Sequence, residues 1–186
     1  MIVPFRTLKA QPWANGAGAT TELLSYTASQ DLAEGLAPFR LSIAALDHPA
    51  EFSLLPGVDR TFTPVGSAVR LAVDGRLHTV EDGASLGFPG EAEVEITDLA
   101  HGCFAVNLMS RRGGGRPAPT AGVVPAAAER GTPAGPAEPL LWVNLEQGAG
   151  RFDLMQGPLG TGRALGVYAP SAGLASPERK PQRRRT

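Results

Sequence analysis

The chain has 186 residues, one cysteine (Cys103) and a formal net charge of −1. A single cysteine excludes an internal disulfide, and no apolar run is long enough to span a bilayer. The last nine residues hold five of the 17 basic and one of the 18 acidic side chains, so the remaining body is acidic, which argues against a nucleic-acid platform. We therefore expect a soluble, cytoplasmic protein with neither a membrane nor a nucleic acid as partner.

The first predicted elements surround a glycine-rich loop. Residues 2–9 predict an edge strand, because Pro4 cannot donate a hydrogen bond to a neighbouring strand. The loop at residues 12–18 follows, and residues 20–27 predict the next strand. The polar stretch 29–35 is expected to be a connection.

A central strand is predicted at residues 39–47. Apolar side chains recur there with the two-residue period of a strand, and Arg40 and Ser42 fall on the opposite face from Phe39. Burying a lone charge is costly unless it is paired, so Arg40 either points to solvent or has a functional reason to be there.

Two short strands are predicted within residues 51–65, separated by the turn signal Pro56-Gly57. Asp59 and Arg60 are neighbours in the second of them. In extended backbone, neighbouring side chains point to opposite faces, so only one of these two can enter a given cavity.

Residues 69–80 predict a β-hairpin, because Asp74-Gly75 between alternating apolar runs favours a type I′ turn. No helix of normal length is predicted, although residues 120–130 could supply a turn or two. Many short strands separated by Gly, Pro and Asp-Gly turns indicate an all-β, antiparallel barrel or sandwich. Further strands are expected at residues 84–88, 91–97, 103–109, 140–145 and 164–169.

The glycine-rich loop lacks the signature of a nucleotide site. A P-loop requires Lys and Ser or Thr after its second glycine, and a dinucleotide fingerprint requires a third glycine at the start of a helix. Gly16 and Gly18 are followed by Ala19-Thr20-Thr21-Glu22 instead. Two interpretations stay open at this point, a tight turn at the start of a strand and a loop that lets a ligand approach the backbone.

Metal and nucleophile chemistry has little support in the sequence. His48, His78 and His101 stand apart from one another and from Cys103, whereas a metal site needs two or three convergent ligands. Cys103 is expected to be a buried, inert thiol. We expect no metal and no other cofactor.

Hydrogen-bonding side chains are the main chemical resource of the chain. Arginine beside Ser, Thr and Asn suits a carboxylate, which accepts two guanidinium hydrogen bonds at once. Glu22 is the best candidate for an acid or base, with a solvated surface carboxylate as the alternative. The hydrogen-bonding side chains that could bind a carboxylate are Asn15, Thr20, Arg40, Ser42, Arg60 and Asn107.

Four segments occur in this order: Pro12-Trp13-x-Asn15-Gly16-x-Gly18-x-Thr20-x-Glu22, Phe39 to Ala44, Phe52-Ser53-x-x-Pro56-Gly57-Val58-Asp59-Arg60, and Asn107-Leu108-Met109. Together they are similar to the HutD/Ves family over about residues 1–110. The resemblance implies a cupin (RmlC-like) fold with two barrels in one chain and an association with histidine utilisation. Ala14 and Ala50-Glu51 depart from the residues common in the family at those positions.

The resemblance also implies roles for individual residues. Ligand-binding positions would be Trp13, Asn15, Thr20, Glu22, Arg40, Ser42, Arg60 and Asn107, with Gly16, Gly18, Phe52 and Asp59 in structural support. The expected domains are a first barrel with the site loop at 1–110, a Gly/Pro/Ala-rich crossover at 111–138, strands of a smaller second barrel at 139–170, and a disordered tail at 171–186. The N-terminal edge strand of the first barrel could pair with the second barrel.

The leading hypothesis is a metal-independent bicupin that binds a small carboxylated metabolite, with Arg40 as the carboxylate anchor, and that regulates or assists histidine utilisation. One alternative is a metal-free isomerase or hydrolase that uses Glu22 as acid or base on an intermediate of that pathway. A second alternative is a protein-interaction module, which would show a large apolar surface patch and a filled barrel. The sequence leaves catalysis and homodimer formation open.

Overall fold

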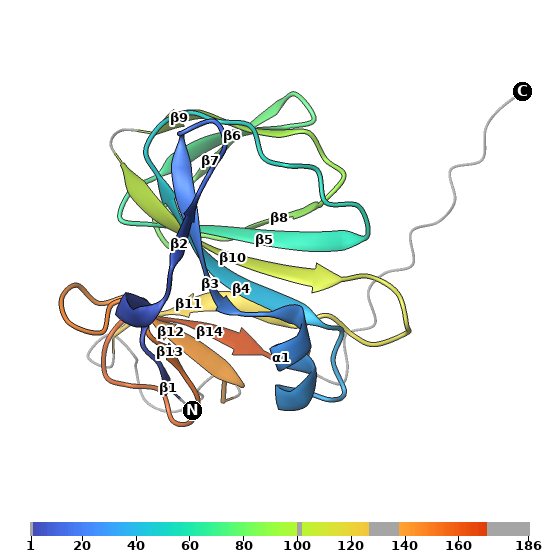
Figure 1. Cartoon of the computed structure of the whole chain (residues 1–186), viewed down its shortest axis with the longest axis vertical. Coiled ribbons are helices and arrows are strands. Elements are labelled where there is room, and N and C mark those ends of the chain that lie inside the picture. Colours follow the sequence, from blue (N-terminus) through green and yellow to red (C-terminus); the bar gives the residue numbers. More distant parts are fainter. Residues whose placement is uncertain (1, 100–101, 127–137, 171–186) are drawn as a thin grey trace, which may run out of the picture.

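The computed structural model describes residues 2–99, 102–126 and 138–170, which fold into three antiparallel β-sheets arranged as layers (Figure 1). The central sheet has the strand order β2-β3-β4-β10-β5-β8, with β2 at Ala10–Pro12, β3 at Gly18–Leu24, β4 at Phe39–Leu46, β5 at Val58–Val65, β8 at Leu86–Pro89 and β10 at Cys103–Arg111. One outer sheet has the order β7-β6-β9, with β6 at Val69–Val73, β7 at Arg76–Val80 and β9 at Val94–Leu99. The other has the order β1-β13-β12-β14-β11, with β1 at Ile2–Val3, β11 at Thr120–Val124, β12 at Leu141–Asn144, β13 at Leu154–Met155 and β14 at Ala164–Tyr168.

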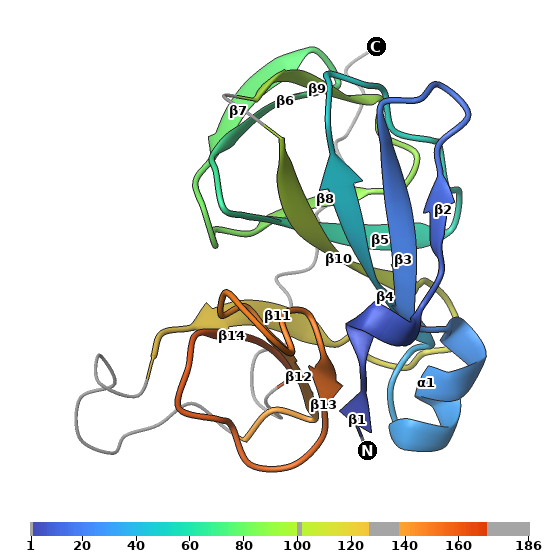
Figure 2. The same cartoon turned by 60° about the vertical axis from the view of Figure 1, so that its left-hand side comes forward.

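Each face of the central sheet buries its own apolar core, and Figure 2 shows the two outer sheets at opposite ends of the molecule. Strand β4 illustrates the arrangement. Leu41 and Ile43 pack into the core shared with the five-stranded sheet, whereas Ala44 and Leu46 pack toward the three-stranded sheet. The two-residue period of the strand therefore sends Ser42 to the same side as Ala44, as the sequence predicts.

The predicted hairpin is confirmed. Asp74 and Gly75 have φ angles of 47° and 77°, the left-handed values that a type I′ turn requires at both central residues. The strand expected at residues 91–97 forms as β9 with one buried and one exposed face, because Val94 and Ile96 are buried while Glu95 is exposed.

A short helix, α1 at Tyr26–Leu32, replaces the predicted end of the strand at residues 20–27 and the connection at 29–35. Ser25 caps the helix, since its side chain accepts a hydrogen bond from the Ala28 N–H. The buried Ser29 hydroxyl accepts another from the Phe39 N–H, which ties the helix to the start of β4. Propensity alone misses a seven-residue helix that depends on a cap and one tertiary hydrogen bond.

The N-terminal prediction is only partly correct. Strand β1 contains Ile2–Val3 alone, pairs with β13 of the five-stranded sheet, and gives way to a 3-10 helix, η1, at Phe5–Thr7. The helical turn considered for residues 120–130 is absent from the described part of that range, because Thr120–Val124 pairs with β14 as strand β11, and residues 127–130 lie outside the described residues. In residues 51–65 only the second of the two predicted strands forms.

The predicted antiparallel, all-β fold is confirmed. Its division into two barrels and the domain boundaries stay predictions. The tail at 171–186, His101 and residues 127–137 of the crossover lie outside the described residues. Within the part of the chain that the structure describes, no helix is both long and apolar enough to cross a membrane.

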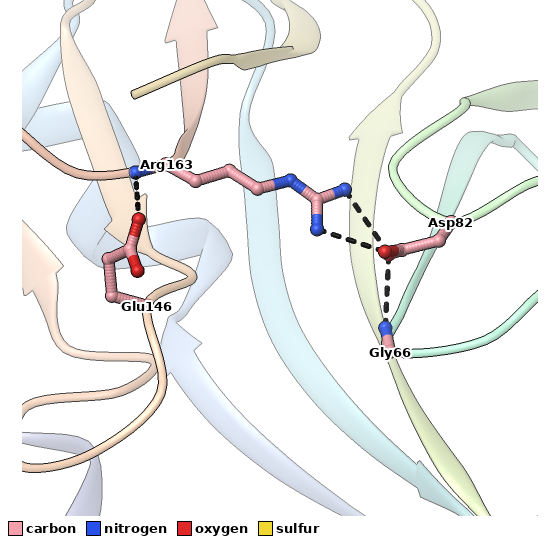
Figure 3. Close-up of polar contacts among 4 residues, drawn as sticks. All are labelled: Gly66, Asp82, Glu146 and Arg163. Atoms are coloured by element: carbon pink, nitrogen blue, oxygen red, sulfur yellow. Dashed lines mark hydrogen bonds and ion pairs between the residues drawn. The ribbon is translucent and has the colours of Figure 1, made fainter. Parts of the chain in front are cut away.

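An ion pair joins the five-stranded sheet to the β7–β8 turn. Both terminal nitrogens of Arg163 donate to the Asp82 carboxylate, at 3.0 and 3.2 Å, and the Gly66 N–H donates to the same group at 3.0 Å (Figure 3). The Arg163 backbone N–H is held in turn by Glu146 at 2.5 Å. Burial alone would raise the pKa of Asp82, but the hydrogen bonds from Arg163 and Gly66 hold it below its ordinary value.

Replacing Asp82 with asparagine is expected to lower the free energy of unfolding at pH 7 by about 1 kcal/mol, because the pair is partly exposed. A depressed folded-state pKa stabilises the protein above the ordinary pKa of an aspartate and ceases to do so as the pH falls through the folded value. Urea denaturation should therefore show that the wild type and Asp82→Asn differ less in their free energy of unfolding at about pH 3 than at about pH 7. The exposed Asp98→Asn is the control, and a difference that is equal at both pH values would contradict the prediction.

Candidate functional site

A cavity of about 370 Å³ opens on the face of the central sheet that is turned toward the three-stranded sheet. The central sheet forms its floor, the glycine-rich loop forms one side, and the segment 51–55 forms another. Its volume lies in the usual range for small-molecule sites. The lining residues are Trp13, Ala14, Asn15, Thr20, Arg40, Ser42, Ala44, Glu51, Phe52, Ser53, Leu55, Arg60, Asn107 and Met109.

Strand register explains why residues distant in sequence meet on this floor. Arg40 in β4 lies opposite Met109 in β10, and Met109 lies opposite Arg60 in β5. These three side chains therefore form one row across the sheet, with the two arginines two strand spacings apart, or about 10 Å. The next row places Ser42 opposite Asn107.

The glycine-rich loop turns tightly before β3. Its backbone closes on itself, because the Trp13 N–H donates to the Gly18 carbonyl at 2.9 Å and the Gly16 N–H donates to the Trp13 carbonyl at 3.0 Å. Gly16 has a φ of +71°, in the left-handed region that favours glycine. The loop is thus a structural turn, and the same turn carries pocket-lining side chains.

Side-chain hydrogen bonds fix the position of the loop's polar groups. The indole N–H of Trp13 donates to the Thr20 hydroxyl at 2.8 Å, and the Asn15 side-chain oxygen accepts from the Ala17 N–H at 3.0 Å. The indole of Trp13 therefore forms a fixed wall of the pocket. The loop and the start of β3 act as one unit at this side of the site.

Arg40 has a close counter-ion. Its Nε is 2.5 Å from a carboxylate oxygen of Glu22, and a terminal nitrogen also contacts the Met109 sulfur at 3.9 Å. Glu22 faces the same side of the sheet because it pairs with Ser42, two residues along β4 from Arg40. The charge of Arg40 is therefore balanced within the sheet.

Arg60, in contrast, is a buried cation without an ion pair among the described residues. The residue is 8% exposed, and its guanidinium lies over the rings of Phe52 and Phe88, at 4.7 and 5.4 Å from the ring centres. One terminal nitrogen donates to the Ser53 carbonyl at 3.2 Å. Burial lowers the pKa of Arg60 to about 10, so the group still carries its charge near neutral pH.

Three polar atoms at this floor have no hydrogen-bond partner within the described part of the chain. They are the Arg60 Nε, the Ser42 hydroxyl and the Asn107 side-chain oxygen, and all three are buried. Buried polar groups are nearly always satisfied in folded proteins, because leaving one unsatisfied is costly. Hydrogen-bonding capacity that no described residue uses is therefore gathered in one cavity.

The structure brings most of the predicted site residues together. Seven of the eight proposed ligand-binding residues line the cavity, and the eighth, Glu22, contacts Arg40 beside it. Of the predicted supporting residues, Phe52 lines the wall and Gly16 and Gly18 form the turn, whereas Asp59 points outward and lies 3.6 Å from Arg112. Their roles toward a ligand stay predictions. The seven residues are Trp13, Asn15, Thr20, Arg40, Ser42, Arg60 and Asn107.

Sequence reasoning missed some residues at the site. Met109 belongs to it because it pairs with Arg40 and Arg60, which only the strand register reveals. Tyr26 at the start of α1 does not line the cavity, but it interacts electrostatically with Arg40. Burial raises the pKa of its phenol, which the charges of Arg40 and nearby arginines partly offset, and the Arg111 guanidinium lies 4.5 Å from its ring centre.

The described residues contain no group of three His, Cys, Asp or Glu side chains placed to hold a metal ion. Cys103 is buried with a free thiol, and burial raises its pKa, which favours the unreactive thiol form.

Comparison with known proteins gives a family and relatives. A family model described as HutD matches residues 6–159. Protein Ves of Cronobacter sakazakii is 38% identical over 104 residues, which are 54% of this chain and 54% of the relative. Protein Ves of Citrobacter koseri is 33% identical over 112 residues, which are 58% of this chain and 56% of the relative. The chain thus spans about half the length of these curated relatives.

Two solved structures share the fold. A conserved protein of unknown function from Pseudomonas aeruginosa PAO1 has a TM-score of 0.58 at 20% identity and covers 91% of both chains. HutD from Pseudomonas fluorescens SBW25 has a TM-score of 0.56 at 18% identity, over 90% of this chain and 97% of that one.

Proposed function

The chain belongs to the HutD family, and we propose that its pocket binds a small carboxylated metabolite in a regulatory or accessory role in histidine utilisation. The observation that carries this proposal is the uncompensated charge of buried Arg60, whose Nε–H has no acceptor among the described residues. A carboxylate offers both the negative charge and several hydrogen-bond acceptor sites.

We assign the carboxylate anchor to Arg60. The sequence favours Arg40, but Glu22 already holds that guanidinium. A ligand carboxylate at Arg60 would accept from its Nε–H, which lacks an acceptor among the described residues. It would also replace a neutral acceptor, the Ser53 carbonyl, by a charged one.

The walls suit a ligand with an apolar or flat body. Trp13 and Phe52 present rings, Leu55 and Met109 add apolar surface, and Asn107 supplies an amide for orientation. Such a division between an anchored charge and an apolar body is typical of small-molecule sites.

The other two hypotheses have less support. An enzyme with Glu22 as acid or base would need that carboxylate free to exchange a proton, whereas it is engaged by Arg40. An interaction module would need a contiguous apolar patch, whereas the large exposed apolar side chains of the described residues, Ile2, Leu54 and Leu77, lie on separate elements.

The test is a calorimetric titration of the purified protein with urocanate, formiminoglutamate and formylglutamate. We expect saturable binding of at least one of them near neutral pH, where Arg60 is charged, and weaker binding at alkaline pH, because burial lowers the pKa of Arg60 to about 10. Silence from all three compounds would contradict the assignment to this pathway. Turnover of any of them that is lost in Glu22→Gln, with binding intact, would favour the enzyme instead.

A further inference from the structure

Two arginines lie in one row of the pocket floor, but only one has a counter-ion among the described residues. Arg40 and Arg60 flank Met109 across the central sheet. The Arg40 side chain is 23% exposed and is paired with Glu22, which is itself 44% exposed. The pocket therefore presents a single uncompensated positive charge at its floor, at Arg60.

We propose that Glu22 is a specificity-determining residue that sets the charge of the ligand. This inference rests on the proposed function and adds to it the ligand class, a compound with one carboxylate and no second anionic group. A second carboxylate placed beside Arg40 would lie next to the Glu22 carboxylate, and two negative charges that share one guanidinium repel each other.

Glu51 adds to the same preference. It lines the cavity and is exposed to solvent, and it has no ion pair within the described ranges. Its charge is screened by water, so its effect is smaller than that of Glu22. Both carboxylates disfavour a dianion, and neither lies against the Arg60 guanidinium, whose stacking partners are Phe52 and Phe88.

The Glu22→Gln substitution isolates the charge. Glutamine has nearly the same size, and its side-chain oxygen still accepts a hydrogen bond from the Arg40 Nε–H. The variant therefore keeps the geometry of the pair while it removes the negative charge. Arg40 then becomes available to a second carboxylate.

Crotonate and fumarate are suitable probes, because they share one trans-alkene skeleton and differ by a methyl group in place of a carboxylate. Both are fully ionised near neutral pH, with one and two negative charges. NMR titrations at constant ionic strength should show that the wild-type protein prefers crotonate. In Glu22→Gln the affinity ratio should move toward fumarate by at least about tenfold, as expected when a charge-assisted hydrogen bond is gained. The exposed Glu93→Gln should leave the ratio unchanged.

The outcomes separate this inference from the proposed function. An affinity ratio that is equal in the wild type and Glu22→Gln would overturn the role of Glu22 while leaving carboxylate binding intact. Loss of crotonate binding in Glu22→Gln would overturn it as well, because Glu22 would then contact the ligand itself. Failure of both probes to bind the wild-type protein would count against the proposed function, and this inference would fall with it.

Discussion

Replacing Arg60 with methionine is expected to abolish carboxylate binding while leaving the stability of the fold unchanged or higher. Two charge-assisted hydrogen bonds contribute about 3 to 6 kcal/mol, so their loss should weaken binding by at least about a hundredfold. Stability should not suffer, because a buried cation without a counter-ion is costly to fold. Methionine still fills the space between Phe52 and Phe88 and makes favourable contacts with aromatic rings.

Calorimetric titration and thermal unfolding of the same samples measure both effects. Arg70→Met is a matched control, since Arg70 is exposed on β6 and absent from the pocket lining, and it should bind as the wild type does. A variant at position 60 that binds normally would show that the anchor lies elsewhere. A large drop in its melting temperature would mean that stacking and the bond to Ser53 outweigh the cost of the buried charge.

Much of the fold could be predicted because strand signals are local. Alternation identified Phe39–Leu46, and Asp74-Gly75 identified the hairpin, since both depend only on neighbouring residues. Helix α1 was missed because it depends on the Ser25 cap and on packing against the start of β4. The stacking of the three sheets depends on which neighbouring sheet each apolar strand face packs against. The two-residue period of a strand does not specify that partner.

Most of the residues predicted to bind a ligand line one cavity, but the arrangement of charges in that cavity was not predicted. Alternation correctly required that only one of Asp59 and Arg60 enter the cavity, and Arg60 is the one that does. Strand register sets Glu22 across from Ser42 and beside Arg40. For this reason the charge of Arg40 is neutralised, whereas the charge of Arg60 is not. Register is fixed by long-range pairing, so a single sequence does not reveal it.

Gly18 is the second position at which a large effect is expected. It opens β3 and pairs with Leu46, and a Cβ atom there would overlap the carbonyl oxygen of Ala45 and lie 3.3 Å from the Trp13 ring. Backbone atoms of a central strand cannot move aside cheaply. Gly18→Ala should therefore lower the free energy of unfolding by about 2 to 3 kcal/mol, the usual cost of forced overpacking.

Comparison with two other glycines separates overlap from backbone effects. Gly16 has open space around its Cβ position but a φ of +71°, so Gly16→Ala should cost about 1 to 2 kcal/mol through backbone strain alone. Gly122 in β11 has neither constraint, and Gly122→Ala should be neutral or slightly stabilising. Urea denaturation gives all three values. If Gly18→Ala cost no more than Gly122→Ala, β3 and β4 would have to separate more readily than their register indicates. The turn that positions Trp13 would then tolerate displacement, and the pocket could not rely on a fixed wall.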